Sequence, residues 1–192
     1  MFEIRLFTER LVIREYRWTD IEKHHALISD PSIMYYIQDV FSASREESEE
    51  NLRNAIEDID NPSRTKVYLV IETKEGDYVG GIGYTVSSHN PAGKRVEIGY
   101  FTYPQFWRKG YATEALKELI KYAFCEDSVY RMDGTCIKEN KASRKVMEKC
   151  GFVFEGERRK FEWHHDSLKG RYVFGLLKEE WEEKQNGCET GN

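Results

Sequence analysis

The sequence predicts one α/β (α+β) domain. In this domain about four helices pack on a mixed β-sheet of about seven strands. Three observations lead to this prediction. Periodic segments occur in the order strand, two helices, three strands, helix, strand, helix and two strands. The 192 residues are enough to bury a sizeable core within one domain. Hydrophobic residues form 40% of the chain and aromatic residues 14%, as in folded proteins.

The N-terminal part is expected to form one strand and two helices. Residues 10–17 are rich in β-branched and aromatic side chains, which predicts a strand. Thr19 and Glu22 have the spacing of a capping box and predict a short helix. Ser44 and Glu47 repeat that spacing before a second helix. The apolar stripe of this helix consists of Leu52, Ala55, Ile56 and Ile59.

Three strands are expected in the middle of the chain. Residues 66–73 and 78–86 flank a glycine-containing link that predicts a hairpin turn, and residues 94–103 follow as the third strand. Three glycines resemble a dinucleotide-binding loop, but they lie inside a strand with no helix directly after them, so a bulge or a close strand approach explains them better. They are Gly80, Gly81 and Gly83.

The C-terminal part is expected to alternate strands and helices. Residues 130–137 predict a strand, and Asn140 is a suitable N-cap for a helix that ends at Gly151. Two further strands are expected near residues 152–162 and 171–177. With no internal repeat or linker, we expect one domain over residues 1–181 and a frayed polar tail over residues 182–192.

Composition and charge narrow the classes of function. The net charge of −5 and the pI near 5.7 argue against a nucleic-acid-binding surface. The first ten residues contain three charged side chains, Glu3, Arg5 and Glu9, and no apolar run in the chain reaches membrane-spanning length. We therefore expect a cytoplasmic protein with neither signal peptide nor membrane anchor. No CxxC pair or metal-ligand spacing occurs among the cysteines and the two adjacent histidine pairs, which predicts reduced thiols and no metal site. These residues are Cys125, Cys136, Cys150, Cys188, His24, His25, His164 and His165.

The segment Trp107–Ala115 predicts an anion-binding loop. A strand is expected to end just before it, and a strongly amphipathic helix begins inside it. The first amides of a helix lack backbone partners and carry partial positive charge. Gly110 permits close approach of the backbone to a phosphate, and Arg108 and Lys109 add full positive charges. A ligand with a pyrophosphate would fit this loop.

Several motifs occur together in one order along the chain. They are Glu97–Pro104, Trp107–Ala115, Asn140–Ser143 and Glu148–Phe152. In this order and spacing the chain resembles the GNAT superfamily of N-acetyltransferases, and most closely its RimJ/RimL branch of ribosomal-protein N-terminal acetyltransferase-like proteins. The resemblance covers residues 8–178.

The resemblance implies a single GNAT-like domain that binds acetyl-CoA between splayed parallel strands, here residues 94–103 and 130–137. It implies that pantetheine lies along the backbone at Phe101 and Thr102, and that the loop amides hold the pyrophosphate. Asn140 and Ser143 would face the thioester. The full set of implied cofactor-binding residues is Phe101, Thr102, Trp107, Arg108, Lys109, Gly110, Tyr111, Ala112, Thr113, Asn140 and Ser143.

Two residues are candidates for catalysis. Glu97 lies on the first splayed strand and is the candidate general base, against the alternative of a surface glutamate paired with an arginine. Many family members carry a proton-donating tyrosine seven residues after the asparagine, where this chain has Met147. Ser143, which the RimJ/RimL branch commonly carries, is the candidate hydrogen-bond donor to the leaving sulfur, against the alternative of a helix-capping residue.

The expected activity is transfer of an acetyl group from acetyl-CoA to a primary amine by direct attack in a ternary complex. The resemblance to the RimJ/RimL branch, with Asn140 and Ser143, implies a protein or peptide N-terminus as the acceptor. Neutralising such an α-amine at pH 7 costs about 1.4 kcal/mol, against about 4.6 kcal/mol for a lysine, so a modest general base would suffice. A small amine, such as a polyamine, amino acid or antibiotic, is the alternative, and a non-catalytic acyl-CoA sensor is a third. The expected partners are acetyl-CoA and the amine, with a homodimer left open.

Overall fold

The computed structural model describes residues 3–61 and 63–189, with side chains through residue 186. The described strands are β1 (Arg5–Phe7), β2 (Leu11–Glu15), β3 (Lys66–Thr73), β4 (Tyr78–Asn90), β5 (Gly93–Thr102), β6 (Val129–Ile137), β7 (Val153–His164) and β8 (Ser167–Leu177). The described α-helices are α1 (Ile21–Ile28), α2 (Arg45–Glu57), α3 (Tyr111–Cys125), α4 (Lys141–Lys149) and α5 (Lys178–Glu189). Short 3-10 helices are η1 (Trp18–Asp20), η2 (Met34–Tyr36) and η3 (Pro104–Phe106).

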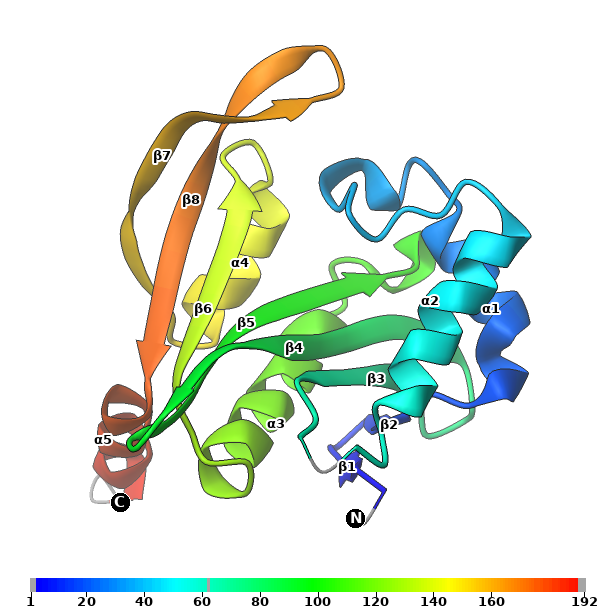
Figure 1. The fold of residues 1–192 in the computed structure, drawn as a ribbon. Helices are drawn as coiled ribbons and strands as arrows, with labels where there is room; N and C mark the ends of the chain where they lie inside the picture. The colour runs from blue at the N-terminus through cyan, green and yellow to red at the C-terminus, as the bar shows by residue number, and fades with distance from the viewer. Residues whose placement is uncertain (1–2, 62, 190–192) are drawn as a thin grey trace. The chain divides into compact units, whose positions relative to one another are not determined.

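The described strands hydrogen-bond in the order β1-β2-β3-β4-β5-β6-β8-β7 (Figure 1). The pair β5–β6 is parallel, whereas β2–β3, β3–β4, β6–β8 and β7–β8 are antiparallel. The predicted mixed sheet with helices is therefore confirmed. The chain forms two compact units, Met1–Thr85 with Gly99–Leu119 and Val86–Ile98 with Ile120–Asn192.

The first unit has its core where α1 and α2 meet β3. Both predicted helices form, and their apolar stripes supply most of the buried side chains. The cluster contains Tyr16, Ile21, Leu27, Ile28, Met34, Leu52, Ala55, Val70 and Tyr78. Gly80 of β4 lies against the backbone of Phe101, where a β-carbon would collide with the Phe101 carbonyl oxygen. A close strand approach thus explains this glycine, as predicted.

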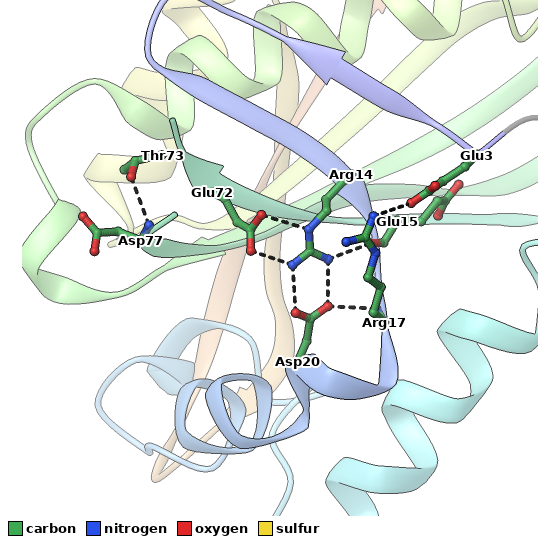
Figure 2. Close-up of polar contacts among 8 residues, drawn as sticks. All are labelled: Glu3, Arg14, Glu15, Arg17, Asp20, Glu72, Thr73 and Asp77. Carbon is green, nitrogen blue, oxygen red and sulfur yellow. Dashed lines mark hydrogen bonds and ion pairs between the residues drawn. The ribbon is translucent and has the colours of Figure 1, made fainter. Parts of the chain in front are cut away.

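A buried ionic network joins β2, β3 and η1 in this unit (Figure 2). The Arg14 guanidinium donates to both carboxylate oxygens of Asp20 at 2.8 Å, and also to Glu72. Only 7% of each of the Arg14 and Asp20 side chains is exposed. The hydrogen bond to Asp20 is the largest cause that raises the pKa of Arg14 above its ordinary value. The guanidinium therefore stays charged and fixes η1 against β2.

The start of the first helical segment differs from the prediction. The side chain that hydrogen-bonds the backbone at this turn belongs to Asp20 and not to Thr19. The Asp20 carboxylate accepts the backbone N–H of Arg17 at 2.8 Å. The short helix predicted from Thr19 and Glu22 does form, as α1. The second cap is confirmed, since Ser44 accepts the backbone N–H of Glu47 at 3.2 Å.

The second unit is built around β6. The parallel pairing of β5 with β6 runs from Lys94 and Val129 to Glu97 and Asp133. On its other side β6 pairs with β8, and β7 with β8 form a long twisted hairpin (Figure 1). Helix α4 lies beside β6, and α3 and α5 meet through Phe124 and Trp181, with ring centroids 5.7 Å apart.

One strand and one α-helix of the described residues were not predicted. Strand β1 is only three residues long, too short for a period to be recognised. Helix α5 begins at Lys178 and includes residues 182–189. A frayed polar tail was predicted for these residues. The tail was predicted from its polarity, but its glutamates and Lys184 have good helix propensity. Residues 190–192 lie outside the described part. No helix within the described residues is long and apolar enough to cross a membrane.

Candidate active site

The predicted anion-binding loop lies in the first unit, between η3 and α3. Helix α3 begins at Tyr111, directly after Gly110, so the first helical amides lie where the sequence predicted. Arg108 has a φ of 59° and Gly110 a φ of 85°. A non-glycine residue with positive φ is strained, and such residues cluster at functional sites. Arg108 and Lys109 are exposed, so their charges remain available to a ligand.

The loop is braced by Arg10, which directly precedes β2, and by Glu114 of α3. Arg10 donates to the carbonyl of Lys109 at 3.0 Å and through Nε to Glu114 at 2.7 Å. Thr8 donates to the same carboxylate at 2.6 Å. Burial raises the pKa of Glu114, but the hydrogen bonds from Thr8 and Arg10 outweigh it and lower that pKa below its ordinary value. Glu114 therefore has a structural role at the start of α3.

The end of β5 is tied to the loop by Trp107. Its indole Nε1 donates to the carbonyl of Thr102 at 2.8 Å, while the ring remains half exposed. The carbonyl of Phe101 lies against Gly80. The Thr102 carbonyl is thus occupied by a side chain of the loop. The pantetheine contact at Phe101 and Thr102 stays a prediction.

The candidate base Glu97 lies in the second unit, at the last residue pair of the parallel β5–β6 ladder. Its Oε1 accepts a hydrogen bond from Thr135 Oγ1 at 3.2 Å. It forms no ion pair among the described side chains, in contrast to the alternative of an arginine-paired surface glutamate. Its neighbour Val96 is buried, so the two side chains occupy opposite faces of the strand.

The start of α4 brings Asn140 and Ser143 together. The Asn140 side chain accepts the backbone N–H of Ser143 at 3.0 Å, which confirms the predicted N-cap. Ser143 lies close to the thiol of Cys136 on β6. Burial raises the pKa of this thiol to about 11, and the contact with Ser143 acts in the opposite direction. Cys136 is therefore a neutral core thiol.

Met147 replaces the usual tyrosine with a core side chain. It is 1% exposed, and its sulfur packs against β6 at Gly134. No proton donor occupies this position, as the sequence indicated.

Three residues that bear on the site were not singled out from the sequence. Arg10 braces the loop across 99 positions of the chain, Thr135 contacts Glu97, and Arg171 contacts Thr135. No local pattern marks such residues, because register alone makes them neighbours. No group of three or more histidine, cysteine, aspartate or glutamate side chains in the described part has metal-binding geometry. Among the described residues, Cys125, Cys136 and Cys150 form no disulfide, and the Cys188 side chain lies outside the described side chains.

Comparison with known proteins supplies the family. A family model described as the acetyltransferase (GNAT) domain matches residues 10–153. The chain belongs to the GNAT acetyltransferase family. The uncharacterized N-acetyltransferase YnaD of Bacillus subtilis (strain 168) is 30% identical over 179 residues, covering 93% of this chain and 99% of YnaD.

Solved structures of GNAT proteins share the fold. A GNAT-family acetyltransferase from Bacillus anthracis superposes with a TM-score of 0.78 at 29% identity, covering 92% of this chain and 99% of its own. Two more distant structures share the fold alone. Spermidine N-acetyltransferase from Vibrio cholerae, with CoA and spermine, has a TM-score of 0.79 at 19% identity over 91% of this chain and 99% of its own. RimL, a ribosomal L7/L12 α-N-protein acetyltransferase in complex with coenzyme A, has a TM-score of 0.78 at 16% identity over 88% and 95%.

This GNAT protein is an N-acetyltransferase with acetyl-CoA as its acetyl donor. The loop fits the diphosphate of that donor, because it combines a helix N-terminus, two positive φ angles and two exposed cations. When bound, acetyl-CoA supplies a thioester whose carbonyl carbon an amine attacks.

Gly110→Val is expected to raise the Kd for CoA about tenfold, because a β-branched side chain is disfavoured by roughly 1–2 kcal/mol at positive φ and would move the loop amides. Isothermal titration calorimetry with CoA measures the change. Gly76→Val is the matched control. Gly76 also has a positive φ, 93°, but it lies in the β3–β4 turn and does not contact the anion-binding loop. Equal CoA affinities for the two variants would show that the Gly110 loop does not bind the phosphates.

Proposed function

We propose that this protein acetylates the N-terminal α-amine of a protein or peptide, as the RimJ/RimL branch does. The observation that carries the proposal is the start of α4. There Asn140 caps the helix and Ser143 occupies its first turn, while Met147 is buried in the core. This arrangement dispenses with the tyrosine donor of other family members and keeps the serine of the branch. The lower cost of neutralising an α-amine supports the same acceptor.

The proposed reaction is direct transfer in a ternary complex. Glu97 accepts the proton of the ammonium group, directly or through water, and the neutral amine attacks the thioester carbonyl. The new N–C bond forms as the C–S bond breaks, and the electron pair of that bond leaves with sulfur as a thiolate. The second proton of the attacking nitrogen passes to this thiolate, directly or through water, which leaves a neutral amide and the free thiol of CoA. The Ser143 hydroxyl, with one proton to donate, would hydrogen-bond the departing sulfur.

The proposed cofactor contacts follow from the same family pattern. The loop from Trp107 to Thr113 would hold the pyrophosphate through its amides and the charges of Arg108 and Lys109. The backbone at Phe101 and Thr102 would run beside pantetheine. In support, the loop has two positive φ angles and is braced by Arg10 from outside the segment.

Acetylation of a small amine is the second candidate function. The spermidine N-acetyltransferase structure shows that the fold serves a polyamine acceptor in that protein. Because that likeness is to the fold alone, the choice depends on the residues that line the acceptor position. Residues about 18–45 and 155–170 are the segments expected to supply them.

A panel of acceptors tests the proposal. Purified protein is incubated with acetyl-CoA and with peptides that differ in their first residue, N-acetylated versions of the same peptides, spermine and single amino acids, and free thiol is followed. We expect turnover only with the free N-terminal peptides. Turnover with spermine or amino acids alone would establish the small-amine function, and CoA binding without turnover would establish a sensor.

A further inference from the structure

Four side chains from four strands of the second unit form a continuous polar chain. Glu97 of β5 accepts from Thr135 of β6 at 3.2 Å. Thr135 in turn contacts Arg171 of β8, whose Nη1 lies 3.2 Å from the threonine oxygen. Glu162 of β7 pairs with the Arg171 Nε at 2.8 Å. The chain thus leads from the β7–β8 hairpin to the candidate base.

The direction of the hydrogen bonds is fixed by chemistry. A guanidinium has donors and no acceptor, so the Thr135 oxygen must accept from Arg171. A hydroxyl has one proton, and this proton remains for the Glu97 carboxylate, which accepts. Arg171 therefore sets the orientation of the Thr135 hydroxyl, and Thr135 sets the position of Glu97 Oε1.

The other charged groups on this face are occupied with one another. Arg95 and Arg131 both bond to Asp133, the residue paired with Glu97 across the ladder. Arg131 also binds Glu155 of β7 at 2.7 Å. Among the described side chains, Thr135 is the one that hydrogen-bonds Glu97. The orientation of Glu97 consequently depends on Thr135 rather than on the nearby arginines.

The location explains why such support is needed. The parallel β5–β6 ladder ends at the pair Glu97–Asp133, and Thr135 lies two residues further along β6. Beyond that pair, backbone pairing between β5 and β6 no longer fixes the relative positions of their side chains. Arg171 and Glu162 are about three-quarters buried, with 26% and 24% of their side chains exposed. Their burial makes them a firm anchor for a threonine at the end of the ladder.

We propose that Thr135 and Arg171 are positioning residues, which hold Glu97 in the orientation that accepts the proton of the attacking amine. This inference rests on the proposed role of Glu97 as base. Arg171 acts through Thr135, and Glu162 holds Arg171 in place from β7. Neither Thr135 nor Arg171 takes part in bond making.

The test compares Thr135→Val, Thr135→Ser, Arg171→Met and the control Arg158→Met, with acetyl-CoA and the fastest acceptor from the panel. Arg158 pairs in register with Arg171 but has its guanidinium over the Phe161 ring, 4.9 Å from the centroid. We expect Thr135→Val and Arg171→Met to lower kcat about tenfold, the loss typical of one hydrogen bond to a charged group. KM for acetyl-CoA should stay unchanged, Thr135→Ser should restore kcat, and Arg158→Met should leave it unaltered.

Repeating Thr135→Val in the Glu97→Gln background separates positioning from a general structural effect. If Thr135 acts through Glu97, its removal should cost little further activity once the carboxylate is gone. An equal tenfold loss in both backgrounds would overturn the proposal, as would full activity of both Thr135→Val and Arg171→Met. Thermal unfolding of each variant identifies any loss of kcat that comes from misfolding. If Thr135→Val is misfolded, kcat of Thr135→Ser is compared with that of the wild type instead. If Glu97→Gln alone leaves kcat unchanged, the proposed base itself is wrong, which is a distinct result.

Discussion

Asp20→Ala is expected to lower the free energy of unfolding by about 3–5 kcal/mol, because it leaves the buried Arg14 guanidinium without its bidentate partner. The loss is large since both side chains are 93% removed from solvent, and only Glu72 remains to balance the charge. The backbone N–H of Arg17 also loses its acceptor. For a chain of this size the midpoint of thermal unfolding should fall by roughly 6–20 °C.

Thr19→Ala is the matched control for this prediction. Thr19 is adjacent to Asp20 and belongs to the capping box that the sequence suggested, whereas the structure assigns the hydrogen bonds to Asp20. We expect the control to change the unfolding free energy by less than about 0.5 kcal/mol. If Thr19→Ala costs as much as Asp20→Ala, the capping box is real and the ionic network contributes little. Differential scanning calorimetry measures both variants.

Glu97→Gln is expected to lower kcat about 100-fold, at the lower end of the contribution of a general base. Glutamine keeps the shape of the side chain and can still accept a hydrogen bond from Thr135, but it cannot take a proton. Raising the pH from 7 toward 9 should restore part of the rate, because an α-amine with a pKa near 8 then loses its proton to solvent. The pH dependence of kcat, measured with the best peptide of the panel, reports this rescue.

Glu157→Gln is the control for the Glu97 prediction. Glu157 is a β7 glutamate paired with Lys138 at 3.0 Å, with no contact to Thr135 or Glu97. Its replacement should leave kcat and its pH dependence as in the wild type. A Glu97→Gln variant with the wild-type pH profile would place the base elsewhere in the protein.

Elements with a local signal were predicted well. The apolar face of α3 is buried at Ala115, Leu116, Leu119, Ile120 and Ala123, as its helical spacing indicated. Asn140 caps α4, because an asparagine and an amide three residues later suffice for that contact. The polar helix α5 and the short strand β1 were missed, since neither has a hydrophobic period of its own.

The residues of the cofactor loop could be predicted from the sequence, whereas the contacts that they and Ser143 form could not. The loop is contiguous, so glycine, cations and helix start could be read within nine residues. The contacts that brace it could not, because Arg10 binds Glu114 from 104 positions away. Ser143 was identified by its place after Asn140, but its contact with Cys136 required the packing of α4 on β6.

The sequence by itself determined the order of the strands and helices other than β1 and α5, the start of α3 after Gly110, and the helix caps at Ser44 and Asn140, because each depends on residues within one or two turns of the chain. The tertiary structure alone decided which side chains meet. Thr135 lies 38 residues from Glu97 and 36 from Arg171, and strand order and register make them neighbours. Arg14 reaches Glu72 across 58 residues for the same reason. Contacts between strands arise from the pairing of distant segments, which no short stretch of sequence encodes.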